Sequence, residues 1–192
     1  MRVQVASEAG EKPYRLEVPW GPTQSGSCFY DLREQPAALE HIEPARRHLA
    51  LRSFLTLVNG SDSIFATVKA QTALSQDAAV ASGAYAFASR VALVFARAEL
   101  NFQRENYEAL LMHLRELLEK DTAPDTLDAE FHIPFCYFHA AARAGHALAF
   151  HLRARGTTPE QAELRWGLGL ARVQQALLFL SRALRQKTSQ SN

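Results

Sequence analysis

The chain has 192 residues, of which 47% are hydrophobic and 21% are charged, and its formal net charge is +1. These values are typical of a folded globular domain and exclude a largely disordered chain. A net charge near zero also argues against nucleic acid or an anionic membrane as a partner, because both require an extended basic surface.

The N-terminal stretch lacks the long apolar core of a signal peptide, and no apolar run approaches the roughly 20 residues of a membrane span. We therefore expect a cytoplasmic protein. The two cysteines, Cys28 and Cys136, are far apart in the sequence and form no Cys-x-x-Cys pair. We expect free thiols, no structural metal and no cofactor.

Residues 1–35 differ in pattern from the rest of the chain. Two short alternating runs flank a turn-like segment there, which predicts a two-stranded β-hairpin followed by a loop. From Pro36 the pattern becomes helical, and Pro44 is expected to restart a helix that Gly60 caps. Residues 64–82 fit a strand and a helical face equally well, so their structure stays undecided.

Further helices are predicted in the second half. Apolar residues recur at steps of three and four from Ala84 to Phe102, and residues 106–120 have the cleanest amphipathic pattern in the chain. The acidic residues of the segment 121–130 suit the start of another helical region. Residues 135–155 would then form a helix that is apolar on nearly all sides and therefore buried.

A last helix is predicted from a capping box at Thr158, Pro159 and Gln161 to about Arg185. Its core-facing seam comprises Ala162, Trp166, Leu170, Val173, Ala176, Leu177, Leu180 and Leu184. A second apolar strip on the opposite side comprises Leu164, Leu168, Ala171, Leu178 and Phe179. Because one apolar face is enough for a helix at the edge of a bundle, we expect the N-terminal hairpin or a second copy of the chain to cover the strip.

These elements together predict a mainly α fold. A single domain would cover residues 1–187, with the hairpin and loop of residues 1–35 laid on an antiparallel bundle of about five helices in residues 36–187. Residues 188–192 would form a flexible tail.

The predicted helix at 135–155 carries one narrow polar arc, formed by His139, Arg143 and His146. The two histidines are about 10 Å apart along a helix, too far to share a metal ion, and Arg143 would repel a cation. The arc suits an oxyanion better, because all three side chains can donate hydrogen bonds. An arc satisfied by solvent or by neighbouring helices is the simpler interpretation. Metal binding by His132 and Cys136 also stays open.

No Walker loop, nucleophile elbow, zinc-protease motif or dinucleotide fingerprint occurs, so catalytic residues are unassigned and the question of enzyme activity stays open. The basic run of Arg46, Arg47, His48 and Arg52 is interpreted as a solvated helix face. The leading hypothesis is a non-enzymatic binding or assembly protein that acts through helical surfaces as a homodimer. The alternative is a protein that binds an acidic small molecule through the polar arc. Neither hypothesis involves nucleic acid or a membrane.

Overall fold

The computed structural model describes residues 1–5, 15–19, 28–76, 84–120 and 127–190. Within these ranges the α-helices are α1 (Glu43–Arg47), α2 (Leu49–Val58), α3 (Arg104–Glu119) and α4 (Pro159–Gln190). The strands are β1 (Arg2–Val5), β2 (Arg15–Val18), β3 (Phe65–Gln76), β4 (Tyr85–Phe95), β5 (Leu127–His132), β6 (Phe135–Phe138), β7 (Arg143–His146) and β8 (Leu148–Gly156). Short 3-10 helices are η1 (Pro36–His41), η2 (Ala98–Phe102) and η3 (His139–Ala141).

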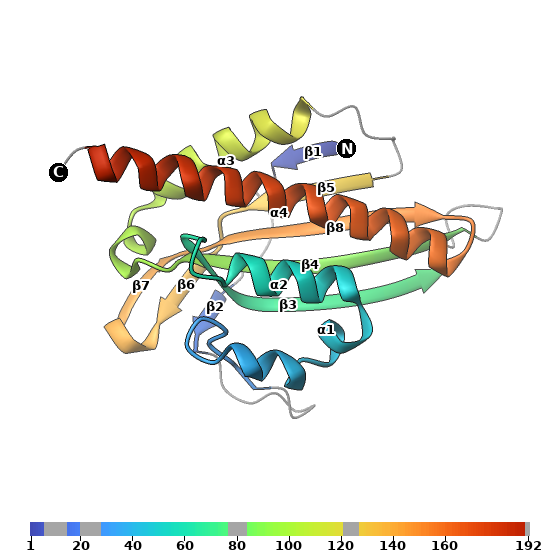
Figure 1. The fold of residues 1–192 in the computed structure, drawn as a ribbon, viewed down its shortest axis with the longest axis horizontal. Helices are drawn as coiled ribbons and strands as arrows, with labels where there is room; N and C mark the ends of the chain where they lie inside the picture. The colour runs from blue at the N-terminus through green and yellow to red at the C-terminus, as the bar shows by residue number, and fades with distance from the viewer. Residues whose placement is uncertain (6–14, 20–27, 77–83, 121–126, 191–192) are drawn as a thin grey trace.

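A five-stranded mixed sheet carries the longer helices on one face. Its strand order is β1-β5-β8-β4-β3, with β1 parallel to β5 and the other neighbours antiparallel. Helix α4 lies across this sheet between α2 and α3 (Figure 1). A smaller sheet of order β2-β6-β7 packs against the opposite face of the large sheet near one end.

The prediction of a mainly helical bundle is wrong, because the fold is mixed α/β with two multi-stranded sheets. The predicted N-terminal hairpin is also wrong. Strand β1 pairs with β5 and β2 pairs with β6, so the two N-terminal strands belong to different sheets. The undecided stretch forms strand β3 as far as Gln76, and residues 77–82 lie outside the described ranges.

Two regions predicted as helix form strands for different reasons. In β8, the apolar Leu148, Phe150 and Leu152 face the helices and alternate with His151 and Arg153, which is the period of a half-buried strand. In β4, residues 91–95 are buried on both faces, so apolar side chains run without alternation and also match a helical spacing. Residues 127–132, predicted to begin a helical region, form the alternating strand β5.

The predictions for helices α3 and α4 are confirmed. Helix α3 covers the amphipathic segment and buries its leucine face, and α4 begins at Pro159. The hydroxyl of Thr158 accepts a hydrogen bond from the backbone N–H of Gln161 at 3.2 Å, as an N-terminal cap should. Helix α2 ends at Val58, just before Gly60.

The main core lies between the large sheet and the three helices α2, α3 and α4. Trp166 of α4 is completely buried, and its ring centroid lies 4.6 Å from that of Phe87 in β4. The indole N–H donates to the hydroxyl of Ser89 at 2.9 Å, so the polar atom of this large side chain is also satisfied. Trp166 therefore fixes the position of α4 over the middle of the sheet.

A second, smaller core joins the two sheets. Leu16, Cys136 and Phe138 of the small sheet belong to the same buried cluster as Ala92 and Val94 of β4. The small sheet thus covers one end of the face of the large sheet that is turned away from the helices. Among the described residues, no helix is both long enough and apolar enough to span a membrane.

A buried polar network joins the end of β4 to the start of α3. The side-chain oxygen of Asn101 accepts hydrogen bonds from the backbone N–H of Phe95 at 2.8 Å and from the hydroxyl of Tyr107 at 2.5 Å. Its amide nitrogen donates to the carbonyl of Phe95 at 2.9 Å. Burial raises the pKa of Tyr107, so the phenol stays protonated and can donate.

We expect Asn101→Ala to lower the free energy of unfolding by about 3 kcal/mol, because it leaves several buried polar groups without their partner. Chemical denaturation monitored by tryptophan fluorescence measures this loss. Asn106→Ala is the matched control: its amide makes one short hydrogen bond, 3.0 Å to the carbonyl of Leu100, at a partly exposed position, so its loss should stay below about 1 kcal/mol. Equal losses in the two variants would contradict the structural role of the network.

Candidate functional site

The three residues of the predicted polar arc lie on the hairpin formed by β6, η3 and β7. Adjacent side chains of a strand point to opposite faces, so Arg143 and His146, three residues apart in β7, lie on opposite faces of the small sheet. Arg143 pairs with the buried Phe138, and His146 pairs with the exposed Phe135. The helical arrangement that motivated the arc is absent from this hairpin.

Each residue of the arc has its own neighbour. The imidazole Nε2 of His139 lies 3.3 Å from a carboxylate oxygen of Glu17, and the guanidinium of Arg143 lies 4.6 Å from the centroid of the Phe102 ring. The structure therefore does not bring His139, Arg143 and His146 together around one point. Oxyanion binding by these three side chains stays a prediction, without converging donors to support it.

His132 and Cys136 occupy different sheets. Burial raises the pKa of the Cys136 thiol to about 12, which disfavours the thiolate form that metals bind. Across the described ranges, no three histidine, cysteine or acidic side chains are grouped as a metal ion would require.

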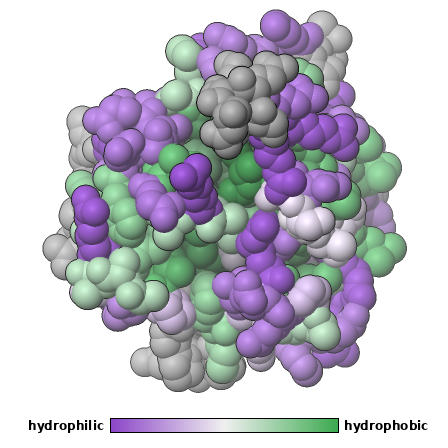
Figure 2. Space-filling model, turned by 60° about the vertical axis from the view of Figure 1, so that its left-hand side comes forward, coloured by the Kyte–Doolittle hydropathy of each residue, from purple (hydrophilic) through white to green (hydrophobic). Residues whose placement is uncertain are grey.

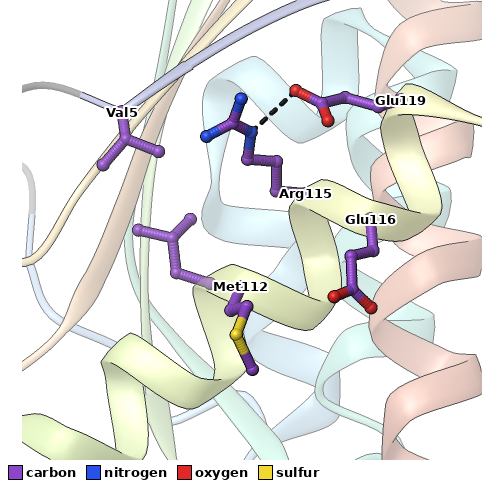
Figure 3. A pocket seen from close by; sticks show the side chains of 6 residues that line it. Val5, Met112, Arg115, Glu116 and Glu119 are labelled. Atoms are coloured by element: carbon purple, nitrogen blue, oxygen red, sulfur yellow. Dashed lines mark hydrogen bonds and ion pairs between the residues drawn. The ribbon is translucent and has the colours of Figure 1, made fainter.

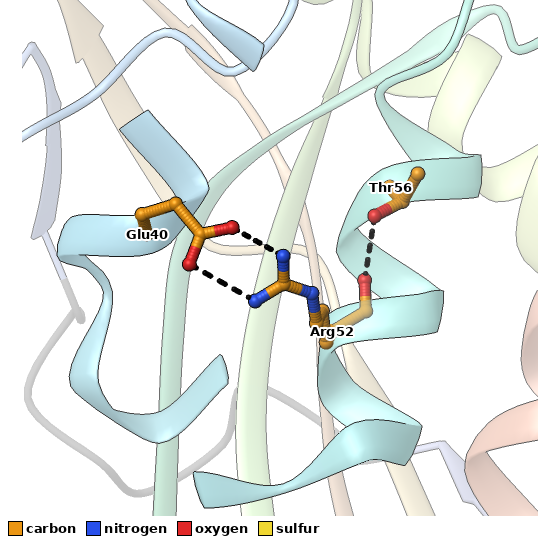
Figure 4. A network of polar contacts seen from close by, with 3 residues as sticks. All are labelled: Glu40, Arg52 and Thr56. Carbon is orange, nitrogen blue, oxygen red and sulfur yellow. Dashed lines mark hydrogen bonds and ion pairs between the residues drawn. The ribbon is translucent and has the colours of Figure 1, made fainter. Parts of the chain in front are cut away.

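Two arginines of the basic run near α2 form ion pairs with neighbouring acids. Arg52 of α2 forms a two-pronged ion pair with Glu40 of η1, and Thr56 donates to the backbone carbonyl of Arg52 (Figure 4). The guanidinium of Arg52 holds the pKa of Glu40 below its ordinary value. Arg47 pairs with an acid of its own helix, Glu43. Arg47 and Arg52 therefore form ion pairs at the surface, whereas His48 of the same run packs against the rings of Phe87 and Trp166.

A shallow groove of about 410 Å³ lies between β1 and α3 (Figure 3). Its lining residues are Val5, Leu111, Met112, Arg115, Glu116 and Glu119. Arg115 donates to Glu119 at 2.7 Å, so two of its charged groups satisfy each other. The groove contains none of the residues singled out in the sequence.

The most extensive exposed apolar feature that we find in the described residues is the outer side of α4. Leu164 is 66% exposed, and Leu168 and Phe179 are each 58% exposed. Ala171 is exposed between them, and Leu178 is partly buried. We refer to Leu164, Leu168, Ala171, Leu178 and Phe179 as the outer stripe.

The outer stripe is separate from the inner seam of α4. Every seam residue from Ala162 to Leu180 is buried against the sheet or the neighbouring helices, whereas Leu184 at the far end is 41% exposed. Figure 2 brings forward the end of the molecule that carries the C-terminal part of α4 and the β6–β7 hairpin, where apolar and polar side chains intermingle. The role of the outer stripe as an interface stays a prediction.

The face of the large sheet that is turned away from the helices carries further charged side chains, which were not predicted from the sequence to form a site. That face carries Arg90 of β4 together with His151 and Arg153 of β8. The alternation of apolar and polar residues from Phe150 to Gly156 is the signal that could have identified it, because such a strand must present its polar side chains on one face.

Comparison with models of protein families, with curated proteins and with solved structures finds no match to this chain. The functional proposals below therefore rest on the residues of the chain itself.

The two cysteines should differ sharply in reactivity. Cys28 is exposed, whereas Cys136 is 2% exposed and its pKa is raised to about 12. A chromogenic disulfide reagent at pH 8 should therefore modify one thiol per native chain and the second only after unfolding. Cys28→Ser should abolish the fast reaction. Rapid modification of two thiols in the native protein would contradict the burial of Cys136.

Proposed function

We propose that the chain is a non-enzymatic assembly protein, and that the outer stripe of α4 binds a second copy of the same chain. The observation that carries this proposal is the symmetric placement of two residue pairs about Ala171. Leu164 and Leu178 each lie seven residues from Ala171, in opposite directions. Glu160 and Arg182 each lie eleven residues from it, again in opposite directions.

This spacing suits an antiparallel pair of α4 helices related by a two-fold axis. At 100° per residue, Glu160, Leu164, Leu178 and Arg182 all lie within about 40° of the direction of Leu164, which is also the side of Ala171. An axis through Ala171 would place Leu164 against Leu178, and Glu160 against Arg182, at both ends of the contact. The methyl group of Ala171 at the crossing point would let the two helices approach closely.

The charges at the ends of the stripe are complementary. Hydrogen bonds from its own backbone N–H and from Thr158 lower the pKa of Glu160, so this carboxylate is ionised at neutral pH. Arg182 is exposed and permanently charged. Antiparallel pairing brings these opposite charges together twice, whereas parallel pairing would place each beside its own copy. The stripe therefore favours the antiparallel arrangement.

The neighbouring helix α2 also carries exposed apolar side chains. A stable interface buries about 800 Å² on each partner, more than a single helix stripe about 23 Å long supplies. Helix α2, which packs against α4, adds the exposed Leu49 and Leu57. A cytoplasmic location stays a prediction of the sequence, and the proposed assembly does not depend on it.

We expect Leu168→Glu to weaken self-association at least about 100-fold. Because the dimer is two-fold symmetric, the substitution removes two leucines from the interface, each contributing about 1.5–3 kcal/mol, and places two carboxylates there instead. Sedimentation equilibrium across micromolar concentrations measures the dissociation constant.

Leu74→Glu is the matched control. Leu74 is 51% exposed on β3, outside α4, and its substitution makes the same chemical change. A wild-type chain that is monomeric at all micromolar concentrations would contradict the proposal. Equal effects of the two variants on the dissociation constant would also contradict it.

The charge pair should set the antiparallel register. We expect Glu160→Arg and Arg182→Glu each to weaken the dimer by about three- to tenfold, because each variant creates two like-charge contacts. The double variant should restore most of the loss at low salt. If the effects of the two single variants simply add in the double variant, the two side chains do not meet, and this register is refuted.

A further inference from the structure

The face of the large sheet opposite the helices carries a group of charged side chains. Side chains that alternate with the core-facing residues Phe87, Val91 and Leu152 must point to that face. Within the described ranges, its charged residues are Arg2, Lys69, Arg90, Asp128, Glu130, Arg153 and Arg155. Positive charge is therefore in excess on this face, although the whole chain is nearly neutral.

The positive and negative charges occupy different strands. Both carboxylates lie on β5, where Asp128 is directly opposite Arg153 and Glu130 is directly opposite His151. Asp128 is also paired with Arg155 at 3.1 Å. Arg90 lies on β4, which is separated from β5 by β8 and therefore by about 10 Å. Arg90 is exposed. The β4 side of the face is the part where an external negative charge would be most favoured.

Arg90, His151, Arg153 and Ala88 form the corners of a small rectangle. Arg90 is directly opposite His151, and Ala88 is directly opposite Arg153. Directly opposite side chains have Cβ atoms about 5 Å apart, and alternate residues of a strand are about 7 Å apart. Three corners thus carry long or ring-shaped nitrogen donors, and the fourth carries a methyl group.

The methyl corner continues onto the neighbouring strand. Ala73 of β3 is directly opposite Ala88, and Gln71 is directly opposite Arg90. Ala73 is exposed and Ala88 is partly exposed. The two alanines, whose side chains are short, form the floor of the cluster. The longer side chains of Gln71, Arg90 and Arg153 lie at neighbouring positions of the sheet. A group bound over the floor would face nitrogen donors on several sides.

We propose that this alanine-floored cluster binds the phosphate group of a small molecule. A tetrahedral oxyanion placed above Ala88 can accept hydrogen bonds from Arg90, Arg153 and His151 through different oxygens. The face of the described sheet carries no aromatic side chain at these positions, so it lacks the stacking surfaces of single-stranded nucleic acid sites. The cluster is separate from the outer stripe, so the two proposals stand or fall independently.

His151 makes the proposed site sensitive to pH. The groups that face it are Arg90 on β4, Glu130 and His132 on β5, and Arg153 on its own strand. Burial, followed by the charge of Arg90, lowers the pKa of His151 below its ordinary value of 6.5. The imidazole is therefore mostly neutral at pH 7.5, and it becomes charged as the pH falls through the lowered pKa. A bound dianion should be held more tightly at the lower pH.

The test is a titration of the isotopically labelled protein with inorganic phosphate, at constant ionic strength, followed through the backbone amide signals of Arg90 and His151. We expect saturable shifts that chloride does not produce and that acetate produces far more weakly. Arg90→Gln should weaken binding at least about tenfold. Ala88→Leu should abolish it, because the larger side chain fills the floor while every charge remains.

Arg97→Gln is the control, since this arginine is 72% exposed outside the cluster and its loss should leave the shifts unchanged. Sulfate, which stays a dianion between pH 7.5 and 5.5, should bind more tightly at pH 5.5. Shifts that do not saturate, equal binding of acetate, or equal affinity in Arg90→Gln and Arg97→Gln would overturn the site. Sulfate affinity that does not change with pH would overturn the part assigned to His151.

Discussion

The burial of Trp166 against β4 is the contact on which the arrangement of the molecule depends. The indole packs on Phe87 and donates to Ser89, while the edge of the His48 ring approaches it from the start of α2. His48 is held in turn by Glu163 at 2.8 Å. One side chain of α4 thus links the sheet to a second helix. With its inner seam fixed in this way, α4 must present Leu168 to the outside.

The helices could be predicted from the sequence more accurately than the sheets. Helix α3 and helix α4 each bury one face and expose the other, so the spacing of their apolar residues defines them. The central strand β4 has buried residues on both faces, and its alanines and valines fit either period. Strand β8 was predictable from the alternation that ends at Gly156. The pairing of β1 with β5 joins segments more than 120 residues apart, which no local pattern encodes.

Whether a candidate site could be predicted depends in the same way on whether its residues lie on one helix or on several strands. The outer stripe lies on one helix, so the spacing from Leu164 to Phe179 was enough to place it on the surface. The arc around Arg143 depended on a helical spacing that a hairpin does not have. The cluster around Arg90 brings together three strands, so only their register could assemble it. The two proposed surfaces lie on opposite sides of the large sheet, so pairing through α4 would leave the phosphate site accessible in both copies.

The most direct measurement of the central claim is disulfide trapping at the proposed two-fold axis. In a Cys28→Ser background, Ala171→Cys should form a covalent dimer rapidly under mild oxidation. The reason is that the two copies of residue 171 would lie at about the 4.4–6.8 Å Cα separation of a disulfide. Leu74→Cys in the same background should cross-link at least about ten times more slowly. Equal rates for the two positions, or a chain carrying Ala171→Cys that stays monomeric, would show that the outer stripe does not pair with itself.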